Sequence, residues 1–146
     1  MVATTGAPPV PVYVRLRIAS ETYAMPVEHV LGVADIGQIR AVPRARPELL
    51  GLWNRRGRIL PVVDLAQLLG VTRTGPPERV LIAEAGGHQA CFAIDDVSEI
   101  GELGDPSEET ESDLLSGATL ADGDLVGVID VLRAFDSLEG LSGERP

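Results

Sequence analysis

The sequence predicts a mainly β protein with a few short helices. Its 16 glycines and 11 prolines supply many turn positions, and they separate short apolar runs of strand length. Hydrophobic residues make up 45% of the chain and aromatic residues only 3%, so the core must consist of Val, Leu, Ile and Ala. At 146 residues, the chain has the length of one ordinary domain, or of two very small ones that share a core.

The charge balance and the cysteine content exclude several classes of protein. The formal net charge of -10 argues against non-specific nucleic-acid binding, because such binding needs a basic surface. Cys91 is the only cysteine, so no intramolecular disulfide forms and a reducing compartment is expected. The chain has neither a signal-like start nor a run of about 18 apolar residues. We therefore expect a cytoplasmic protein without direct membrane insertion.

The chain is expected to have one ordered domain between two short ends. Residues 1–11 are small, proline-rich and unpatterned, which predicts a flexible lead-in, and residues 139–146 form a C-terminal tail. The domain then covers residues 12–138. Its first strand, at residues 13–18, should have one buried and one wet face, because three apolar residues alternate with other types: Val14, Leu16 and Ile18. Residues 23–27 should pair back onto it, with a proline near the strand end.

The next segment offers little material for chemistry. The apolar spacing of residues 28–36 is mixed, so a turn and a short strand both fit. His29 lies there and the other histidine, His88, is distant in the sequence, so neither a metal site nor a Ser-His-Asp arrangement is predicted. The chain contains no phosphate-loop motif, and no cofactor is expected.

Residues 50–70 carry the strongest pattern. Two apolar runs are joined by Asn54-Arg55-Arg56-Gly57, which predicts a hairpin closed by a type I turn and a left-handed glycine. Asn54 suits the first turn position because its side chain can accept from the backbone ahead, and Gly57 suits the fourth. The central residues, Arg55 and Arg56, should then point into solvent, where a partner can meet them.

The second half of this stretch changes to helical spacing at Asp64. We expect Asp64 to cap the helix, with Gln67 completing a capping-box pattern and Gly70 ending the helix. Three leucines should face a core: Leu65, Leu68 and Leu69.

A proline-rich loop before the hairpin carries further arginines. They either join those of the hairpin in a local positive patch for an acidic partner, or are ordinary solvated loop charges. Both interpretations stay open for the set Arg40, Arg44, Arg46, Arg55, Arg56 and Arg58.

A second hairpin is predicted from apolar strands at residues 79–84 and 89–94, joined by a glycine turn. Asp95 and Asp96 are interpreted as turn or strand-end residues, because adjacent carboxylates on an extended chain point in opposite directions. Residues 102–113 form an acidic loop, which is either a solvated linker or a partner-binding acidic patch.

The closing segment repeats the arrangement of the central one. After a short bridge at residues 114–120 and a hairpin turn at Asp122-Gly123, a strand covers residues 125–129. Asp130 is expected to cap a short helix with three apolar residues, Val131, Leu132 and Phe135. A buried strand, an Asp cap and a short helix thus occur twice, and whether this reflects an internal duplication stays open.

On these motifs, the chain resembles the CheW-like family of chemotaxis coupling proteins. The family pattern of a Val-Pro linker followed by G-[VIL]-x-N-x-R-G-x-[IV]-[IL]-P-V-[VI]-D-L is met by Val42-Pro43 and by residues 51–65. Residues 93–97 are similar to its apolar-x-V-D-x-V segment, and residues 122–130 to its closing strand and helix. The resemblance covers residues 12–138.

The resemblance implies a fold of two small five-stranded β-barrel subdomains packed on a shared apolar core. It implies a non-enzymatic adaptor that joins the cytoplasmic tips of chemoreceptors to the regulatory domain of a histidine kinase. Such an adaptor is expected to be monomeric alone and to enter larger arrays with these partners. Neither a cofactor nor a metal is implied.

The family motif also implies which residues meet the partners. Arg56 is the expected contact, and Asn54 and Gly57 fix the turn that presents it. Arg55 departs from the family, which usually has an apolar residue there, so the tip is more basic in this chain. Three further residues either contribute to a receptor or kinase surface or fill a barrel: Val27, Val30 and Leu31.

Two other functions fit parts of the sequence. A coupling protein of a related receptor-kinase array, for example in surface motility, would use the same residues. A small-ligand enzyme would have to use Asp64, Asp95 or Asp130 as acid or base, yet no His, Cys or Lys is evidently paired with one of them. Asp64 and Asp130 are therefore interpreted as structural helix caps.

Overall fold

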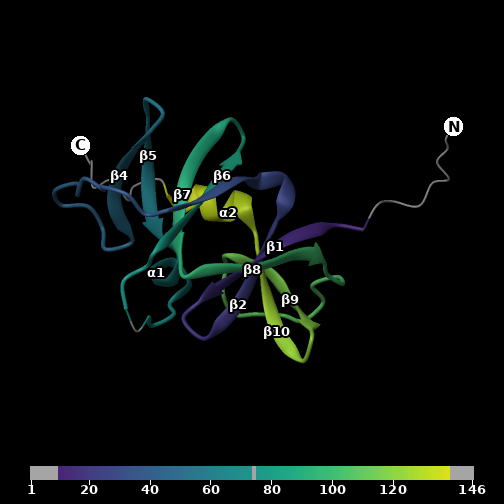
Figure 1. The fold of residues 1–146 in the computed structure, drawn as a ribbon. Helices are drawn as coiled ribbons and strands as arrows, with labels where there is room; N and C mark the ends of the chain where they lie inside the picture. The colour runs from purple at the N-terminus through teal and green to yellow at the C-terminus, as the bar shows by residue number, and fades with distance from the viewer. Residues whose placement is uncertain (1–9, 74, 139–146) are drawn as a thin grey trace, which may run out of the picture.

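Two five-stranded sheets make up the molecule, which confirms the mainly β prediction (Figure 1). The computed structural model describes residues 10–73 and 75–138. The predicted lead-in at residues 1–11 lies almost wholly outside the described residues, and the predicted tail at residues 139–146 lies wholly outside them. Three short helices accompany the sheets in the described ranges: the 3-10 helix η1 (Val27–His29), α1 (Leu65–Leu69) and α2 (Val131–Asp136).

The two sheets have the same design. The strand order is β8-β1-β2-β10-β9 in the first sheet and β3-β6-β7-β5-β4 in the second. The pairs β10 with β2 and β5 with β7 are parallel, and the other pairs are antiparallel. The first sheet contains β1 (Val12–Ile18), β2 (Glu21–Pro26), β8 (Asp96–Glu102), β9 (Leu115–Ala121) and β10 (Asp124–Ile129). The second contains β3 (Val30–Asp35), β4 (Leu49–Arg55), β5 (Arg58–Asp64), β6 (Arg79–Ala85) and β7 (His88–Ile94).

Each sheet is assembled from both halves of the chain. β1 and β2 join the first sheet, whereas the following β3, β4 and β5 join the second. β6 and β7 then complete the second sheet, and β8, β9 and β10 return to the first. Corresponding strands of the two halves thus take corresponding places, but in opposite sheets. Neither sheet can form from one half alone.

Local geometry also repeats between the halves. Gly57 and Gly123 close equivalent hairpins with φ angles of 82° and 85°. Asp64 and Asp130 cap the helices that follow those hairpins. The sequence interval between the two glycines equals the interval between the two aspartates. This agreement supports the internal duplication that the sequence left open.

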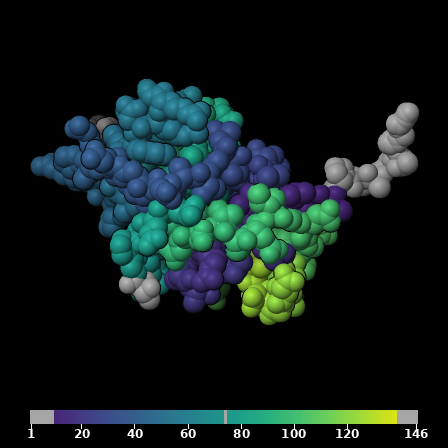
Figure 2. Space-filling view, in the orientation of Figure 1, coloured from purple at the N-terminus to yellow at the C-terminus, as the bar shows by residue number. Residues whose placement is uncertain are grey.

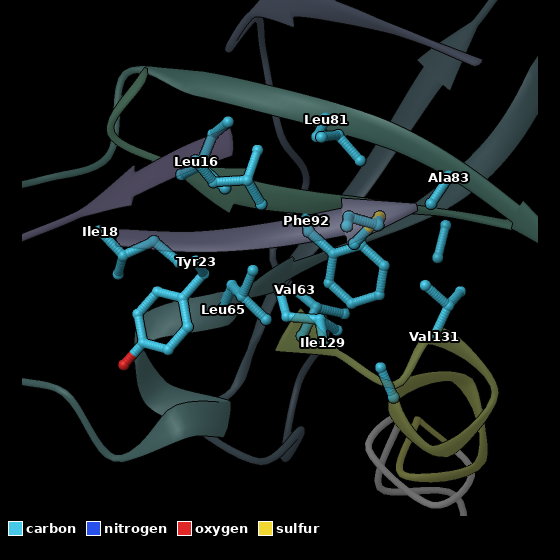
Figure 3. Packing of buried hydrophobic residues seen from close by; sticks show 14 of the residues in the cluster. Leu16, Ile18, Tyr23, Val63, Leu65, Leu81, Ala83, Phe92, Ile129 and Val131 are labelled. Carbon is cyan, nitrogen blue, oxygen red and sulfur yellow. The ribbon is translucent and has the colours of Figure 1, made fainter. Parts of the chain in front are cut away.

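Apolar side chains are buried on both faces of the sheets. One face of each sheet packs against the other sheet in a shared core, and the opposite faces cover smaller clusters of their own. Figure 3 shows the shared core, in which Leu16 of β1, Phe92 of β7 and Ile129 of β10 converge. Tyr13 is only 7% exposed in the first sheet's own cluster, so the predicted wet face of β1 was wrong at this residue.

Several elements differ from the sequence prediction. In the uncertain segment at residues 28–36, the start belongs to the 3-10 helix η1 and residues 30–35 form strand β3, so the strand alternative is right for its larger part. β8 occupies Asp96–Glu102, where only strand-end residues and the start of the acidic loop were predicted, and β9 replaces the predicted bridge. The acidic loop is anchored by Leu103, which is buried, and by a bridge from Glu108 to Ala118. Leu132 of α2 is 60% exposed and does not face the core.

Gly51 provides a test of this packing, because the loop before β4 crosses directly over it. A Cβ atom at Gly51 would lie 2.4 Å from the C=O oxygen of Arg40 and 2.4 Å from the Cγ2 of Ile39. We therefore predict that Gly51→Ala lowers the free energy of unfolding by about 1–3 kcal/mol, as overpacking does elsewhere. Urea unfolding of the purified protein measures this change.

The matched control for that prediction is Gly101→Ala in β8. A Cβ atom at Gly101 would meet no heavy atom within 4 Å. The control should change the free energy of unfolding by less than about 0.5 kcal/mol. Equal stability of the two variants would contradict the close crossing at Gly51.

Candidate functional site

The hairpin between β4 and β5 is closed by a two-residue turn. Arg55 and Arg58 form its last pair, so the loop consists of Arg56 and Gly57. Their φ angles, 54° and 82°, are both positive, which is typical of a type I′ turn. The predicted type I turn with Arg55 at its centre was therefore wrong. The prediction for Asn54 is confirmed, because its Oδ1 accepts the N–H of Gly57 at 2.9 Å.

Successive residues of the hairpin face opposite sides of the ribbon. Trp53 packs against the second sheet's own cluster, and Arg55 lies half-buried on the same inner side. Asn54 pairs with Ile59 on the outer side, where Ile59 is 57% exposed. Arg56, at the tip, is exposed. The prediction that both arginines point into solvent is thus confirmed for Arg56. It was wrong for Arg55, because Arg55 is a strand residue on the inner face.

The inner position of Arg55 also affects a buried thiol. Cys91 is 0% exposed, and burial raises its pKa to about 11 because the thiolate would lose its hydration. The positive charge of Arg55 acts in the opposite direction, as the smaller of the two effects. The apolar residue that the family usually carries at this position would suit the same inner face.

The edge strand β4 forms a groove with the loop that precedes it. Backbone hydrogen bonds of 2.8 and 2.9 Å join Leu52 to Arg40, so the loop extends the edge of the sheet. The groove has a volume of about 900 Å³ and combines apolar, amide and guanidinium groups from Gln38, Ile39, Arg40, Leu52, Trp53, Asn54 and Ile59. We call this groove, together with the tip residue Arg56, the hairpin surface. The other two loop arginines, Arg44 and Arg46, are exposed and do not line it.

A second apolar surface lies where the two sheets meet. η1 packs against β1 of the first sheet and β6 of the second, whose outer neighbours are the edge strands β8 and β3. Figure 2 shows the indigo segment near residue 30 and the green segment near residue 100 on the same face of the molecule. We call this the junction surface, and its exposed apolar side chains are Val27 (38%), Leu31 (46%), Val33 (38%) and Ile100 (63%).

The sequence left open whether Val27, Val30 and Leu31 lie on a surface or fill a barrel. Val27 and Leu31 are exposed, so the interpretation that they fill a barrel was wrong for both. Val30 is half-buried and packs against the shared core beneath them. Val33 and Ile100 were missed by the sequence analysis. The alternation of apolar residues along β3 could have indicated Val33, whereas Ile100 stands between polar neighbours and glycine without such a pattern.

The equivalent hairpin of the first sheet differs in chemistry. Leu120 and Leu125 pair across β9 and β10 at the places that Asn54 and Ile59 take in the second sheet. These two leucines are 69% and 56% exposed, and the sequence analysis missed them. The tip residue there is Asp122, which binds Arg15 at 2.9 Å. The duplicated framework thus presents a positive tip at one end and a negative tip at the other.

Both predicted helix caps are present. Asp64 accepts the N–H of Ala66 through its Oδ1 at 3.1 Å, and Asp130 accepts the N–H of Arg133 in the same way at 3.1 Å. Gly70 ends α1 in the left-handed conformation, with a φ of 75°. The structural roles predicted for these residues are therefore confirmed.

The predicted capping box is absent. The backbone N–H of Asp64 donates to the C=O of Glu48 at 2.8 Å, so it is not available to the side chain of Gln67. This bond belongs to the end of the ladder between β4 and β5, and it holds the start of α1 in place. The predicted core contacts are present: Leu65 is fully buried, and Leu68 and Leu69 pack against the shared core.

The carboxylates considered for catalysis take part in helix caps and ion pairs, and two of them share one arginine. Asp64 accepts from the Nη2 of Arg73 at 2.8 Å, and Asp95 accepts from the Nη1 of the same arginine. Asp130 pairs with Arg133 at 3.5 Å beside α2. Residues 10–73 and 75–138 contain no group of three or more His, Cys, Asp or Glu side chains that could hold a metal ion. Across the same ranges, no helix has the length and apolar character needed to span a membrane.

The fold and its exposed surfaces indicate a class of protein. Two sheets with exchanged strands, carboxylates used in caps and ion pairs, and two exposed apolar surfaces are typical of a protein-binding module. The CheW-like domain family matches residues 12–139, and the chain belongs to this family. Relatives of the chain include proteins named as chemotaxis proteins.

Individual relatives agree with this assignment. Protein FrzA of Myxococcus xanthus is 32% identical over 83 residues, which are 56% of this chain and about half (52%) of that protein. The probable chemotaxis protein CheW of Rhizobium etli is 26% identical over 136 residues, which are 86% of this chain and 88% of the relative. The crystal structure of the scaffolding protein TtCheW from Thermoanaerobacter tengcongensis has the same fold, with a TM-score of 0.77 and 24% identity over 90% of this chain and 91% of that one.

The raised pKa of Cys91 predicts a pH dependence of stability. The thiol of the unfolded chain loses its proton near its ordinary pKa of 9.0, whereas the folded thiol keeps its proton until about 11. The unfolded state therefore binds fewer protons in this interval, and the free energy of unfolding should fall as pH rises from about 9 to about 11. Urea unfolding at several pH values, compared with Cys91→Ala, measures this contribution. Parallel pH profiles of the two proteins would contradict it.

Proposed function

We propose that this chain links the cytoplasmic tips of chemoreceptors to the regulatory domain of a histidine kinase, without catalysing a reaction itself. Membership of the CheW-like family and the relatives named as chemotaxis proteins support this proposal. The observation that carries it to this chain is the exposed Arg56 at the tip of a hairpin whose turn is held by Asn54 and Gly57.

The hairpin surface suits one of these two partners. Leu52 and Ile59 are 36% and 57% exposed, so they offer apolar area for burial. Arg40 and Arg56 add positive charge at the rim of this area, on a chain whose net charge is -10. Interfaces commonly combine an apolar centre with a polar rim, and arginine is enriched among their strongest contacts. A partner with an acidic and partly apolar surface would complement it.

The junction surface suits the other partner. Its exposed side chains are apolar, and the half-buried Val30 fixes the backbone beneath Val27 and Leu31. The junction surface includes β3 and the hairpin surface includes β4, and these strands are the two ends of the second sheet's strand order. Two separate surfaces allow receptor and kinase to bind at the same time, as a coupling protein requires.

The same residues also bear on location and on a related system. We expect the protein to reside in the cytoplasm and to reach membrane-associated arrays through its receptor partner. A coupling role in another receptor-kinase array is the alternative, and the match to a relative named FrzA rather than CheW is the observation behind it. Binding assays with receptor tips and kinase domains from candidate systems distinguish the two.

Arg56→Glu tests the hairpin surface. The substitution reverses the charge at an exposed tip, so it should weaken binding of one partner by about tenfold or more, which corresponds to about 1.4 kcal/mol. The free energy of unfolding should change by less than about 0.5 kcal/mol, because an exposed tip residue adds little to stability. Isothermal titration calorimetry with a receptor-tip fragment and with a kinase regulatory domain measures the binding.

Arg44→Glu is the matched control. It makes the same charge change at an exposed loop position that also has a positive φ, 65°, and that does not line the groove. This variant should bind both partners as the parent protein does. Unimpaired binding of both partners by Arg56→Glu, or equal losses in the two variants, would refute the assignment of the hairpin surface.

A further inference from the structure

The chain passes from the second sheet to the first at a single residue, Asp95. β7 ends at Ile94 in the second sheet, and β8 begins at Asp96 in the first (Figure 1). The opposite crossing, from β2 to β3, runs through η1, which packs against both sheets. Asp95 is therefore the whole linker between the two sheets. Its backbone conformation sets the direction of β8 relative to β7.

Three hydrogen bonds hold Asp95. Its N–H donates to the C=O of Arg17 at 3.0 Å, and its Oδ2 accepts the N–H of Ala19 at 2.6 Å. Ala19 lies in the turn between β1 and β2 with a φ of 57°, a conformation that residues other than glycine seldom adopt. The Oδ1 of Asp95 accepts from the Nη1 of Arg73. The carboxylate thus joins a turn of the first sheet to an arginine that follows α1.

Arg73 connects Asp95 to the second sheet. Its Nη2 donates to the Oδ1 of Asp64 at 2.8 Å, and Asp64 both ends β5 and caps α1. The Arg73 and Asp64 side chains are 9% and 12% exposed, and that of Asp95 is 32% exposed. Removing one member of such a shielded group leaves another charge without its partner, so the arrangement resists rearrangement. One continuous set of contacts therefore runs from the α1 cap to the β1–β2 turn.

We infer that Asp95, held by Arg73, is a positioning residue that seats β8 on β1, the strand against which η1 packs, and thereby assembles the junction surface. The inference rests on the proposed function, because the junction surface is one of its two binding surfaces. β8 contributes Ile100 to that surface, follows Asp95 directly in the chain, and pairs along its length with β1. The hairpin surface is built from β4, β5 and the preceding loop, and its lining residues include neither Asp95 nor any of the residues that bind its side chain.

Two substitutions remove the ion pair between Asp95 and Arg73. Asp95→Asn keeps an oxygen for the N–H of Ala19, and Arg73→Met keeps an unbranched apolar stem but removes the guanidinium, and with it the pair to Asp64 as well. The matched control is Asp122→Asn, which removes a pair of 2.9 Å with Arg15 that lies entirely within the first sheet.

The binding test uses the full chain with a purified receptor-tip fragment and a purified kinase regulatory domain. One partner should still bind the Arg56→Glu variant normally. For that partner, both Asp95→Asn and Arg73→Met should lower the affinity by about tenfold. They should change the affinity for the other partner by less than about twofold, as should the control for both partners. Arg73→Lys keeps the charge and should recover part of the affinity that Arg73→Met loses.

A second measurement needs no partner. Nitroxide labels are attached at Leu120→Cys in β9 and His88→Cys in β7, in a Cys91→Ala background. Double electron–electron resonance spectroscopy then measures the distance between the two labels, and so between the two sheets. Asp95→Asn and Arg73→Met should shift or broaden the distance distribution, whereas Asp122→Asn should leave it unchanged.

The outcomes separate the inference from the proposed function. Unchanged distance distributions and unchanged affinities in both substituted proteins overturn the inference, as does an equal loss of affinity for both partners. If the parent chain binds neither partner, the proposed function fails, and the distance measurement still decides the role of Asp95. If Asp95→Asn does not fold, the comparison of Arg73→Met with Arg73→Lys decides it.

Discussion

The two halves of the chain exchange strands, and the shared core and both exposed surfaces require this exchange. Each sheet needs one hairpin from the first half and another from the second. Neither half can therefore pair the backbone N–H and C=O groups at its strand edges by itself. The shared core closes only when both sheets are present, since Leu16, Phe92 and Ile129 come from strands far apart in the sequence. The hairpin surface and the junction surface are consequently parts of one body, which suits a protein that must hold two partners in a fixed arrangement.

Features that depend on neighbouring residues could be predicted from the sequence. The caps at Asp64 and Asp130 and the helix end at Gly70 follow from side-chain and backbone geometry within a few residues, and all three are present. The hairpin tip was predicted in the right place but with the wrong register. Asn54 can bond the backbone of Gly57 in either turn type, and the choice depends on cross-strand pairing that the tip residues alone do not reveal.

Features that depend on distant parts of the chain could not be predicted in this way. Tyr13 was expected on a wet face, but the first sheet's own apolar cluster covers it. β8 has no apolar alternation, because it is an edge strand whose place is set by its pairing with β1 and by the contacts of Asp95. At the candidate site, the exposure of Arg56 was predicted, whereas Ile100 required the structure. The expected partners came from the family resemblance, not from residue patterns.

The exchanged strands should make the two sheets a single cooperative unit of unfolding. Trp53 is the only tryptophan and lies in the second sheet, so its fluorescence reports the unfolding of that sheet. Amide signals from β1, β2 and β10 in nuclear magnetic resonance spectra report the first sheet in the same urea titration. We expect coincident transitions of both sheets with one midpoint, as for a two-state protein. Loss of the first-sheet signals at a lower urea concentration than the change in Trp53 fluorescence would contradict it.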